Sequence, residues 1–300
     1  MSAPDRPVSR LAPRGAPGLA GRLGLALAGP DPLALPLRML LLALLLNAAL
    51  HWVWPGDRLP VLLLATAGLL SDRARRQPAL WAGLGGVLGL RLLLDWPFPD
   101  NHDYLACYAA LSVAGALLSP APSRDLARGA TWLLGLAFGF AVLWKGFLSP
   151  DFVDGRFFRV TLLFDSRFHD LARLVGGMSE TLFEHNEAVL EGTAAGFAEP
   201  PRLRLLARGL TLLTLGLETG IALAFLWPGD RRVARVGDAL LIVFCVGTYA
   251  IAPVAGFGWL LAALGCARTG PARPGFRLAW VLVFGLVLLY RLIPVTGFAS

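Results

Sequence analysis

Apolar residues fill long stretches of the chain, separated by short breaks that carry arginine, glycine and proline. The stretches lie at 37–54, 59–71, 79–96, 104–119, 130–148, 204–227, 236–252, 254–267 and 278–293. Several are shorter than the roughly 20 residues that a helix perpendicular to a bilayer needs, but their recurrence is typical of membrane helices. The pattern predicts an all-α polytopic transmembrane helix bundle of about nine spans over residues 37–293.

Arginine side chains gather in every second break between these stretches. The clusters are Arg6, Arg10, Arg14 and Arg22; Arg73, Arg75 and Arg76; Arg124 and Arg128; Arg231, Arg232 and Arg235; and Arg268, Arg273 and Arg277. The breaks between them, at 55–58, 97–103 and around Pro253, contain only Arg58. The positive-inside rule places the clusters on the cytoplasmic side, so we expect a multi-pass inner or plasma membrane protein with a cytoplasmic N-terminus. Two passes over 236–267 preserve the alternation, whereas one pass breaks it.

Three segments fall outside the apolar stretches. Residues 1–36 are rich in Pro, Gly, Ala and Arg and predict a disordered cytoplasmic tail, and 294–300 form a short C-terminal tail. The connection 149–203 is expected to be an extracytoplasmic helical insertion. Its first half, 156–175, has apolar residues at helical spacing and suits a helix on the membrane surface, while a solvated helix begun by Ser179 is expected over 179–197.

Composition supports a lipid environment and excludes several functions. Hydrophobic residues make up 56% of the chain and charged residues 16%, below the quarter that a water-soluble surface needs. The net charge of +7 resides in the arginine clusters instead of one basic face, so no nucleic-acid partner is expected. The three cysteines have unrelated spacings, and we expect neither a metal site nor a disulfide. Ala, Gly, Leu, Pro and Arg are in excess, as in bacterial proteins from GC-rich genomes.

Ionisable groups inside apolar segments are costly and are therefore candidates for function. They are Arg91, Asp95, Lys145, Glu218 and Arg291, with His51 and His102 at segment ends. Arg91 and Asp95 are four residues apart, so a structural ion pair on one helix face is the simpler interpretation for them.

Lys145 is the one lysine among 27 basic residues, and it ends an apolar segment. A lysine at an interface can simply extend its amine to water. Arginine cannot lose its proton in a protein, however, so a retained lysine also suggests a need for a neutral amine. Glu218 lies in mid-segment, where pairing with Lys145 or a hydrogen bond to Asn101 would relieve the cost of burial.

His102 lies in a proline-bearing turn that leads into the fourth apolar segment. Asn101 and Asp103 beside it are ordinary helix-starting residues, so a helix cap is one interpretation. The other is proton exchange, because an imidazole titrates near neutral pH. The fourth segment begins on the side where the fifth ends, so His102 and Lys145 share one membrane face, and His51 joins them.

Three places in the chain, spread over residues 90–230, resemble one family. Asp100-Asn101-His102-Asp103-Tyr104-Leu105 is similar to an Asn-His-x-Tyr-Leu turn that opens a helix. Trp144-Lys145 followed by Asp151-Phe152-Val153-Asp154-Gly155 is similar to a helix-ending lysine followed by Asp-Trp-x-x-Gly. Leu217-Glu218-Thr219-Gly220 is similar to a helix with an acidic residue beyond a long loop. The pattern resembles the membrane region of vitamin K-dependent gamma-carboxylase and its bacterial relatives, the horizontally transferred transmembrane (HTTM) proteins.

The resemblance implies a lipophilic ligand in an outward-facing cavity. In the carboxylase the corresponding lysine deprotonates reduced vitamin K, so the likeness implies catalytic roles for Lys145 and His102 and a reduced quinone as cofactor. Asn101, Glu218, Trp144 and Tyr104 are then expected to bind the ligand, with carboxylase-like or oxidoreductase activity. The alternative is a non-catalytic membrane helper that docks a partner protein or assists maturation of a secreted peptide. Both alternatives have membrane lipid as a partner, and a transporter fits less well because no inverted repeat is evident.

Overall fold

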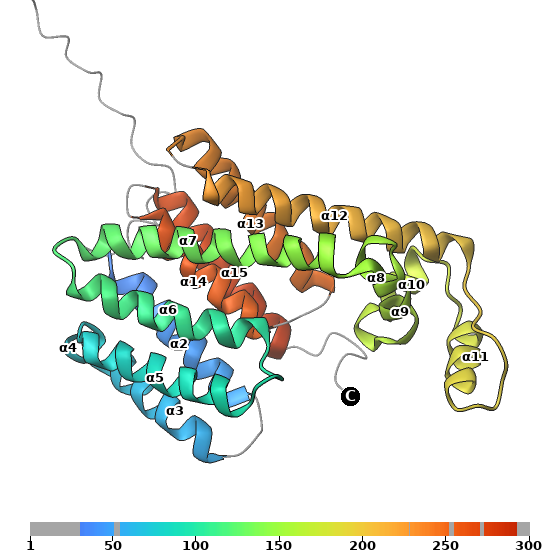
Figure 1. Ribbon diagram of the computed structural model, residues 1–300, viewed down its shortest axis with the longest axis horizontal. Helices are drawn as coiled ribbons and strands as arrows, with labels where there is room; N and C mark the ends of the chain where they lie inside the picture. Colours follow the sequence, from blue (N-terminus) through green and yellow to red (C-terminus); the bar gives the residue numbers. More distant parts are fainter. Residues whose placement is uncertain (1–30, 51–54, 228, 252–254, 271–272, 293–300) are drawn as a thin grey trace, which may run out of the picture.

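A computed structural model describes residues 31–50, 55–227, 229–251, 255–270 and 273–292. These residues form helices and turns without a strand, which confirms the expected all-α class. The described part of the chain contains an elongated bundle with a smaller helical unit at one end (Figure 1). Most of the expected N-terminal tail, His51 and residues 294–300 lie outside the described residues, as does the side chain of Arg291.

Within the described residues, each apolar stretch of the sequence lies largely in a helix. The bundle helices are α2 (Ala34–Leu50), α3 (Pro55–Leu70), α4 (Asp72–Arg75), α5 (Pro78–Leu94), α6 (Asn101–Leu118), α7 (Pro122–Leu143), α12 (Pro201–Leu226), α13 (Arg231–Ile251), α14 (Ala255–Thr269) and α15 (Pro274–Leu292). Residues 55–58, expected to form a loop, are the first turn of α3, and the Arg58 side chain there is buried. The helix α2 begins inside the segment 31–36 that was assigned to the tail.

The stretch 236–267 forms two helices that fold back on each other. The guanidinium of Arg268, near the end of α14, donates to the carbonyl of Ala234, near the start of α13, at 2.7 Å. At the other end of the pair, Gly258 lies so close to the ring of Tyr249 that a Cβ there would be 2.5 Å away. The two helices are therefore antiparallel, and the expectation of two helices here is confirmed.

Small residues let α14 form the centre of the bundle. It packs against α2, α7 and α15, and nearly all its side chains from Trp259 to Ala267 are buried. A Cβ on Gly265 would lie 2.6 Å from the indole of Trp280 in α15, so the glycine permits this close approach. The Trp280 indole also donates to Thr269 Oγ1 at 2.9 Å, which fixes the ring between the two helices.

Two of the arginine clusters, 73–76 and 268–277, lie at one end of the bundle. Arg76, after α4, pairs with Asp31, just before α2. The guanidinium of Arg277 in α15 is buried and donates to the carbonyl of Pro32 at 2.8 Å. The start of α2, the end of α3 and the start of α15 therefore lie together, as alternating helix directions require.

The insertion 149–203 forms a separate helical unit. It contains α8 (Pro150–Val153), α9 (Arg156–Phe164), the 3₁₀ turn η2 (Ser166–Phe168), α10 (His169–Leu174) and α11 (Glu180–Leu190). The expected single helix over 156–175 is wrong, because Asp165 ends α9 in an extended conformation and accepts a hydrogen bond from the Arg167 amide that starts a new turn. Ser179 caps α11 as expected, although the helix ends before Gly192, whose φ is +76°.

The insertion has a hydrophobic core of its own, built on the first turns of α12. Its buried members are Phe152, Phe158, Leu162, Leu163, Phe168, Ala172, Met178, Phe183, Leu203 and Ala207. Glu199 fastens it further, since its carboxylate accepts hydrogen bonds from Arg159 at 2.6 and 3.0 Å and from Arg204. Burial alone would raise the pKa of Glu199, but the two arginines outweigh burial and hold that pKa below its ordinary value.

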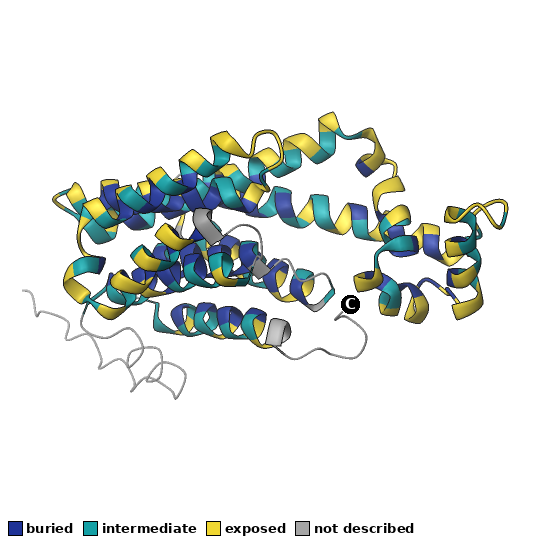
Figure 2. Cartoon of the chain, turned by 90° about the horizontal axis from the view of Figure 1, so that it is seen from below, coloured by how far each residue is buried: buried dark blue, intermediate teal, exposed yellow. Residues whose placement is uncertain are grey.

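Two described helices are long and apolar enough to cross a membrane. They are α7 with the turn that follows it, 27 residues over Pro122–Leu148, and α12, 26 residues over Pro201–Leu226. Only 28% and 33% of their apolar windows are buried inside the protein. Figure 2 shows buried positions on the inward sides of the helices and exposed positions on the outward sides. Four further apolar helices are shorter: Ala34–Leu50, Arg58–Leu70, Pro78–Leu94 and Pro274–Leu289.

Candidate functional site

Lys145 lies in a π-helical turn at the end of α7. The turn η1 (Trp144–Leu148) continues α7, and Pro150 then starts α8 in a new direction. The Lys145 side chain is 27% exposed, and its ammonium lies 5.2 Å from the centre of the Phe152 ring in α8. Such turns insert one residue into a helix and are frequent at functional sites. From this turn Lys145 contacts Phe152 of α8 and Glu218 of α12.

Glu218 of α12 is the partner of Lys145. The Lys145 ammonium donates to Oε1 of this carboxylate, whose side chain is only 4% exposed. The sequence left two partners open for Glu218, and the structure selects Lys145, while Asn101 is exposed at the start of α6. The second carboxylate oxygen, Oε2, is buried and has no hydrogen-bond partner among the described residues. An unpartnered buried oxygen is costly, so the site has capacity for one further donor.

His102 is buried where three helices meet. A Cβ on Gly256, in the first turn of α14, would lie 3.0 Å from His102 Cδ2 and 2.6 Å from the side-chain oxygen of Asn47 in α2. The absence of a side chain on Gly256 therefore allows Asn47 and His102 to approach α14. Sequence reasoning missed both neighbours, although an amide inside an apolar stretch is a signal for Asn47.

The residues around His102 also start α6. Asp100 is the N-cap residue, and its amide donates to Asp103 Oδ2 at 3.2 Å. Their carboxylates lie 3.8 and 3.9 Å from the two imidazole nitrogens of His102. Ligand atoms of these three residues lie within 4.8 Å of one another, but the cap already explains why the two carboxylates are there. The helix-cap interpretation of this turn is thus confirmed. Tyr104, in the first turn of α6, is half-buried.

His102 and Lys145 lie near the same end of the bundle, with different described neighbours. The helix α6 begins near the end where α7 finishes (Figure 1). His102 faces α2 and α14, whereas Lys145 faces α8 and α12. Phe138 links the two regions, because its ring lies 6.5 Å from that of Phe257, the neighbour of Gly256. Phe138 precedes Lys145 by seven residues, about two helical turns. His102 and Lys145 thus have separate described neighbours and do not form one contact pair.

The other candidates have simpler roles. Arg91 and Asp95 form the expected ion pair on α5, with 3.2 Å between Nε and Oδ2. Trp144 is 63% exposed beside the Lys145–Glu218 pair, so it borders the site from outside. The three cysteines are buried and free.

No family model, curated protein or solved structure matches this chain. Functional inference therefore depends on the arrangement of these residues and on the chemistry they permit.

Proposed function

We propose that the chain is a multi-pass inner-membrane protein of HTTM type that binds a lipophilic ligand of the quinone class beside Lys145 and Glu218. The observation that carries this proposal is a pair between a partly exposed lysine and a buried glutamate. One oxygen of that carboxylate has no partner among the described residues, and the lysine lies at the end of a helix that is long and apolar enough to span a bilayer. His102, buried against α2 and α14 near the same end of the bundle, forms the second part of the proposed site.

Exposed apolar side chains support the membrane placement. Leu70, Leu93, Phe140 and Leu212 are 84%, 77%, 65% and 72% exposed, and they come from four different helices. Such a distribution is unfavourable in water and ordinary in lipid. About nine passes, with the arginine clusters and the N-terminus in the cytoplasm and the insertion outside, follow from the positive-inside rule.

The Lys145–Glu218 pair is suited to accepting and returning a proton. In a site with little water, an ammonium–carboxylate pair has only a small advantage over its neutral form, because desolvation opposes both charges. The partial exposure of Lys145 gives the amine access to a ligand, while Glu218 is held behind it. Lys145 can then act as a general base whose positive charge the carboxylate compensates.

The residues present fit a hydroquinone. Such a ligand supplies an acidic phenolic hydroxyl and two electrons. Glu218 Oε2 offers an acceptor for a hydroxyl, Phe152 offers aromatic surface beside the amine, and the exposed ring of the adjacent Trp144 offers more. Asn101, His102 and Tyr104 lie at the start of α6, where they would orient a polar group of an elongated ligand.

Ligand binding to the purified protein in lipid nanodiscs tests the proposal. A short-chain naphthohydroquinone is titrated while tryptophan fluorescence is recorded, and lipid extracts of the protein are screened for quinones by mass spectrometry. Lys145→Ala and Glu218→Gln should each weaken binding at least ten-fold, whereas Arg91→Gln, which alters an ion pair on α5, should leave it unchanged. Full hydroquinone binding and turnover by Lys145→Ala would remove the assignment.

A non-catalytic helper is the second candidate, and the insertion favours it. The unit has its own core, yet Phe157 and Val160 of α9 are 50% and 56% exposed. Exposed apolar residues on a folded cap are suited to contact with a partner protein or a secreted peptide. A specific partner that co-purifies equally with the wild type, Lys145→Ala and His102→Ala would favour this function over ligand turnover.

A further inference from the structure

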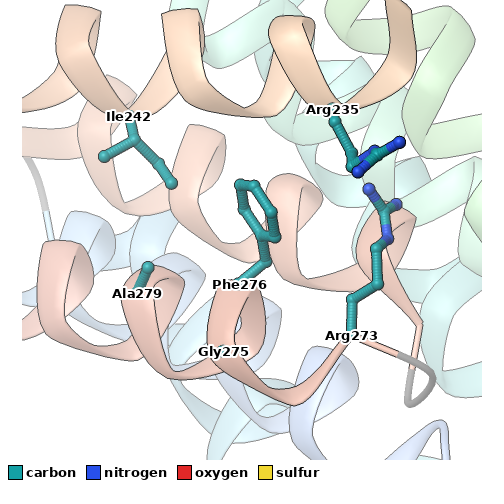
Figure 3. A pocket seen from close by; sticks show the side chains of 6 residues that line it. All are labelled: Arg235, Ile242, Arg273, Gly275, Phe276 and Ala279. Atoms are coloured by element: carbon teal, nitrogen blue, oxygen red, sulfur yellow. The ribbon is translucent and has the colours of Figure 1, made fainter. Parts of the chain in front are cut away.

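A groove opens between α13 and α15 at the arginine-rich end of the bundle. Its volume is about 450 Å³, and its lining residues are Arg235, Ile242, Arg273, Gly275, Phe276 and Ala279. Figure 3 shows the side chains of Arg235 and Arg273 reaching toward each other from the two helices. Ile242, Phe276 and Ala279 line the groove away from this pair of cations. The groove therefore has a cationic end and an apolar end.

Arg273 at the cationic end also has a carboxylate partner. Asp238 is completely buried, and its carboxylate accepts a hydrogen bond from Arg273 at 2.6 Å. The same carboxylate also pairs with Arg268. One negative charge is thus shared by two guanidinium groups, and Arg235 adds a third guanidinium that has interactions of its own. Two arginines that face each other across a gap favour an oxyanion between them, since a guanidinium binds phosphate through parallel hydrogen bonds.

The apolar end extends along the helices away from the arginines. Ile242 follows Arg235 by seven residues on α13, which is about 10 Å of helix. Ala279 of α15 follows Arg273, the residue just before that helix, by six. Phe276 lies between them, and its ring is 5.7 Å from the Arg273 guanidinium. A small anion such as free phosphate would use only the cationic end. An amphipathic anion would fill both ends.

We propose that this groove binds an anionic phospholipid of the cytoplasmic leaflet. The phosphate lies between Arg235 and Arg273, and one acyl chain runs past Phe276 to Ile242 and Ala279. This site is independent of Lys145, although it depends on the placement of α13 and α15 in a bilayer. Basic pockets between membrane helices are suited to such head groups, and the positive-inside orientation places the groove in the leaflet that is rich in them.

Lipid binding to the full-length protein in detergent tests the proposal. Native mass spectrometry compares phosphatidylglycerol with phosphatidylcholine of identical acyl chains, and inorganic phosphate is added as a competitor. Phosphatidylglycerol should bind at least ten-fold more tightly than phosphatidylcholine. It should not be displaced by 10 mM inorganic phosphate, because the acyl chain adds contacts that free phosphate lacks. A site that used only the two arginines would bind inorganic phosphate as well, and the lipid would then be displaced.

Three variants distinguish the parts of the groove. Arg235→Gln should reduce phosphatidylglycerol binding at least five-fold without affecting phosphatidylcholine. Ala279→Trp fills the apolar end while keeping both arginines, and it should reduce binding of phosphatidylglycerol similarly. Arg124→Gln removes an exposed arginine at the start of α7 and should have no effect. Thermal unfolding of each variant verifies that it is folded.

Two results would overturn the proposal. Equal binding of the two lipids, or wild-type binding by both Arg235→Gln and Ala279→Trp, means that the groove is not a lipid site. Displacement by inorganic phosphate together with normal binding by Ala279→Trp means that the arginines hold a small anion instead. Neither result affects the Lys145 site, because hydroquinone binding there is measured separately.

Discussion

Replacing Lys145 with methionine should destabilise the protein by an amount that depends on pH. Methionine keeps most of the side-chain volume but leaves Glu218 buried without its cation. Losing one partner of a buried ion pair costs roughly 3–5 kcal/mol. The variant can avoid a buried charge by protonating the carboxyl group, which for an ordinary glutamate at pH 7 costs about 3.7 kcal/mol and at pH 5 about 1 kcal/mol. The loss of stability should therefore be about 3–4 kcal/mol at pH 7 and roughly 2–3 kcal/mol smaller at pH 5.

The reverse variant, Glu218→Met, should cost less, because Lys145 is 27% exposed and can reach water. The double variant should be closer to the wild type than Lys145→Met, with a coupling energy of about 2 kcal/mol or more. Equilibrium unfolding in mixed detergent micelles measures all four proteins at both pH values. Arg91→Met is the control, since its pair with Asp95 is more exposed and is worth about 1 kcal/mol or less. Additive single effects, or equal losses at pH 7 and pH 5, would refute the reasoning.

Three further predictions concern the fold. Glu199→Gln should lower the unfolding temperature at neutral pH. Because the pKa of Glu199 is depressed in the folded protein, its carboxylate stabilises the fold above its ordinary pKa of 4.5, and this stabilisation is lost as the pH falls through the folded pKa. The unfolding temperatures of wild type and variant should therefore converge at low pH in a pH series. Asp238→Asn removes the completely buried carboxylate that two arginines share and should cost about 3–5 kcal/mol in detergent unfolding. Gly265→Ala inserts a methyl group against Trp280 and should cost about 1–3 kcal/mol, whereas Gly285→Ala, with nothing within 4 Å, should be neutral or slightly stabilising.

The helices could be predicted from the sequence because their signal is local. The described part of each apolar stretch is largely helical, and the arginine alternation correctly separated α13 from α14. The sequence predicted one continuous helix over 156–175, and the structure breaks it at Asp165. The spacing of apolar residues does not reveal a break that a single residue causes. Asp165, whose side chain bonds to the Arg167 amide, is that residue, and its competition with the helix is visible only in three dimensions.

The candidate site was predictable only in part. The cost of a charge in an apolar segment identified Lys145 and Glu218, but the choice between Lys145 and Asn101 as partner depends on how α7 and α12 are rotated against each other. The π turn that carries Lys145 has no sequence signature that could have located it. The approach of Asn47 and Gly256 to His102 joins three helices distant in sequence, so no local pattern contains it.

Labelling of introduced cysteines tests the central claim, a bundle that spans the membrane with its arginine end and its insertion on opposite sides. Gln77→Cys and Thr193→Cys each place one exposed thiol, at the arginine end and in the insertion respectively, while the three native cysteines are buried. In intact spheroplasts, a membrane-impermeant maleimide should label Thr193→Cys at once and Gln77→Cys only after the membrane is permeabilised. Equal labelling of both cysteines before permeabilisation, or release of the protein from membranes by alkaline carbonate, would contradict the account.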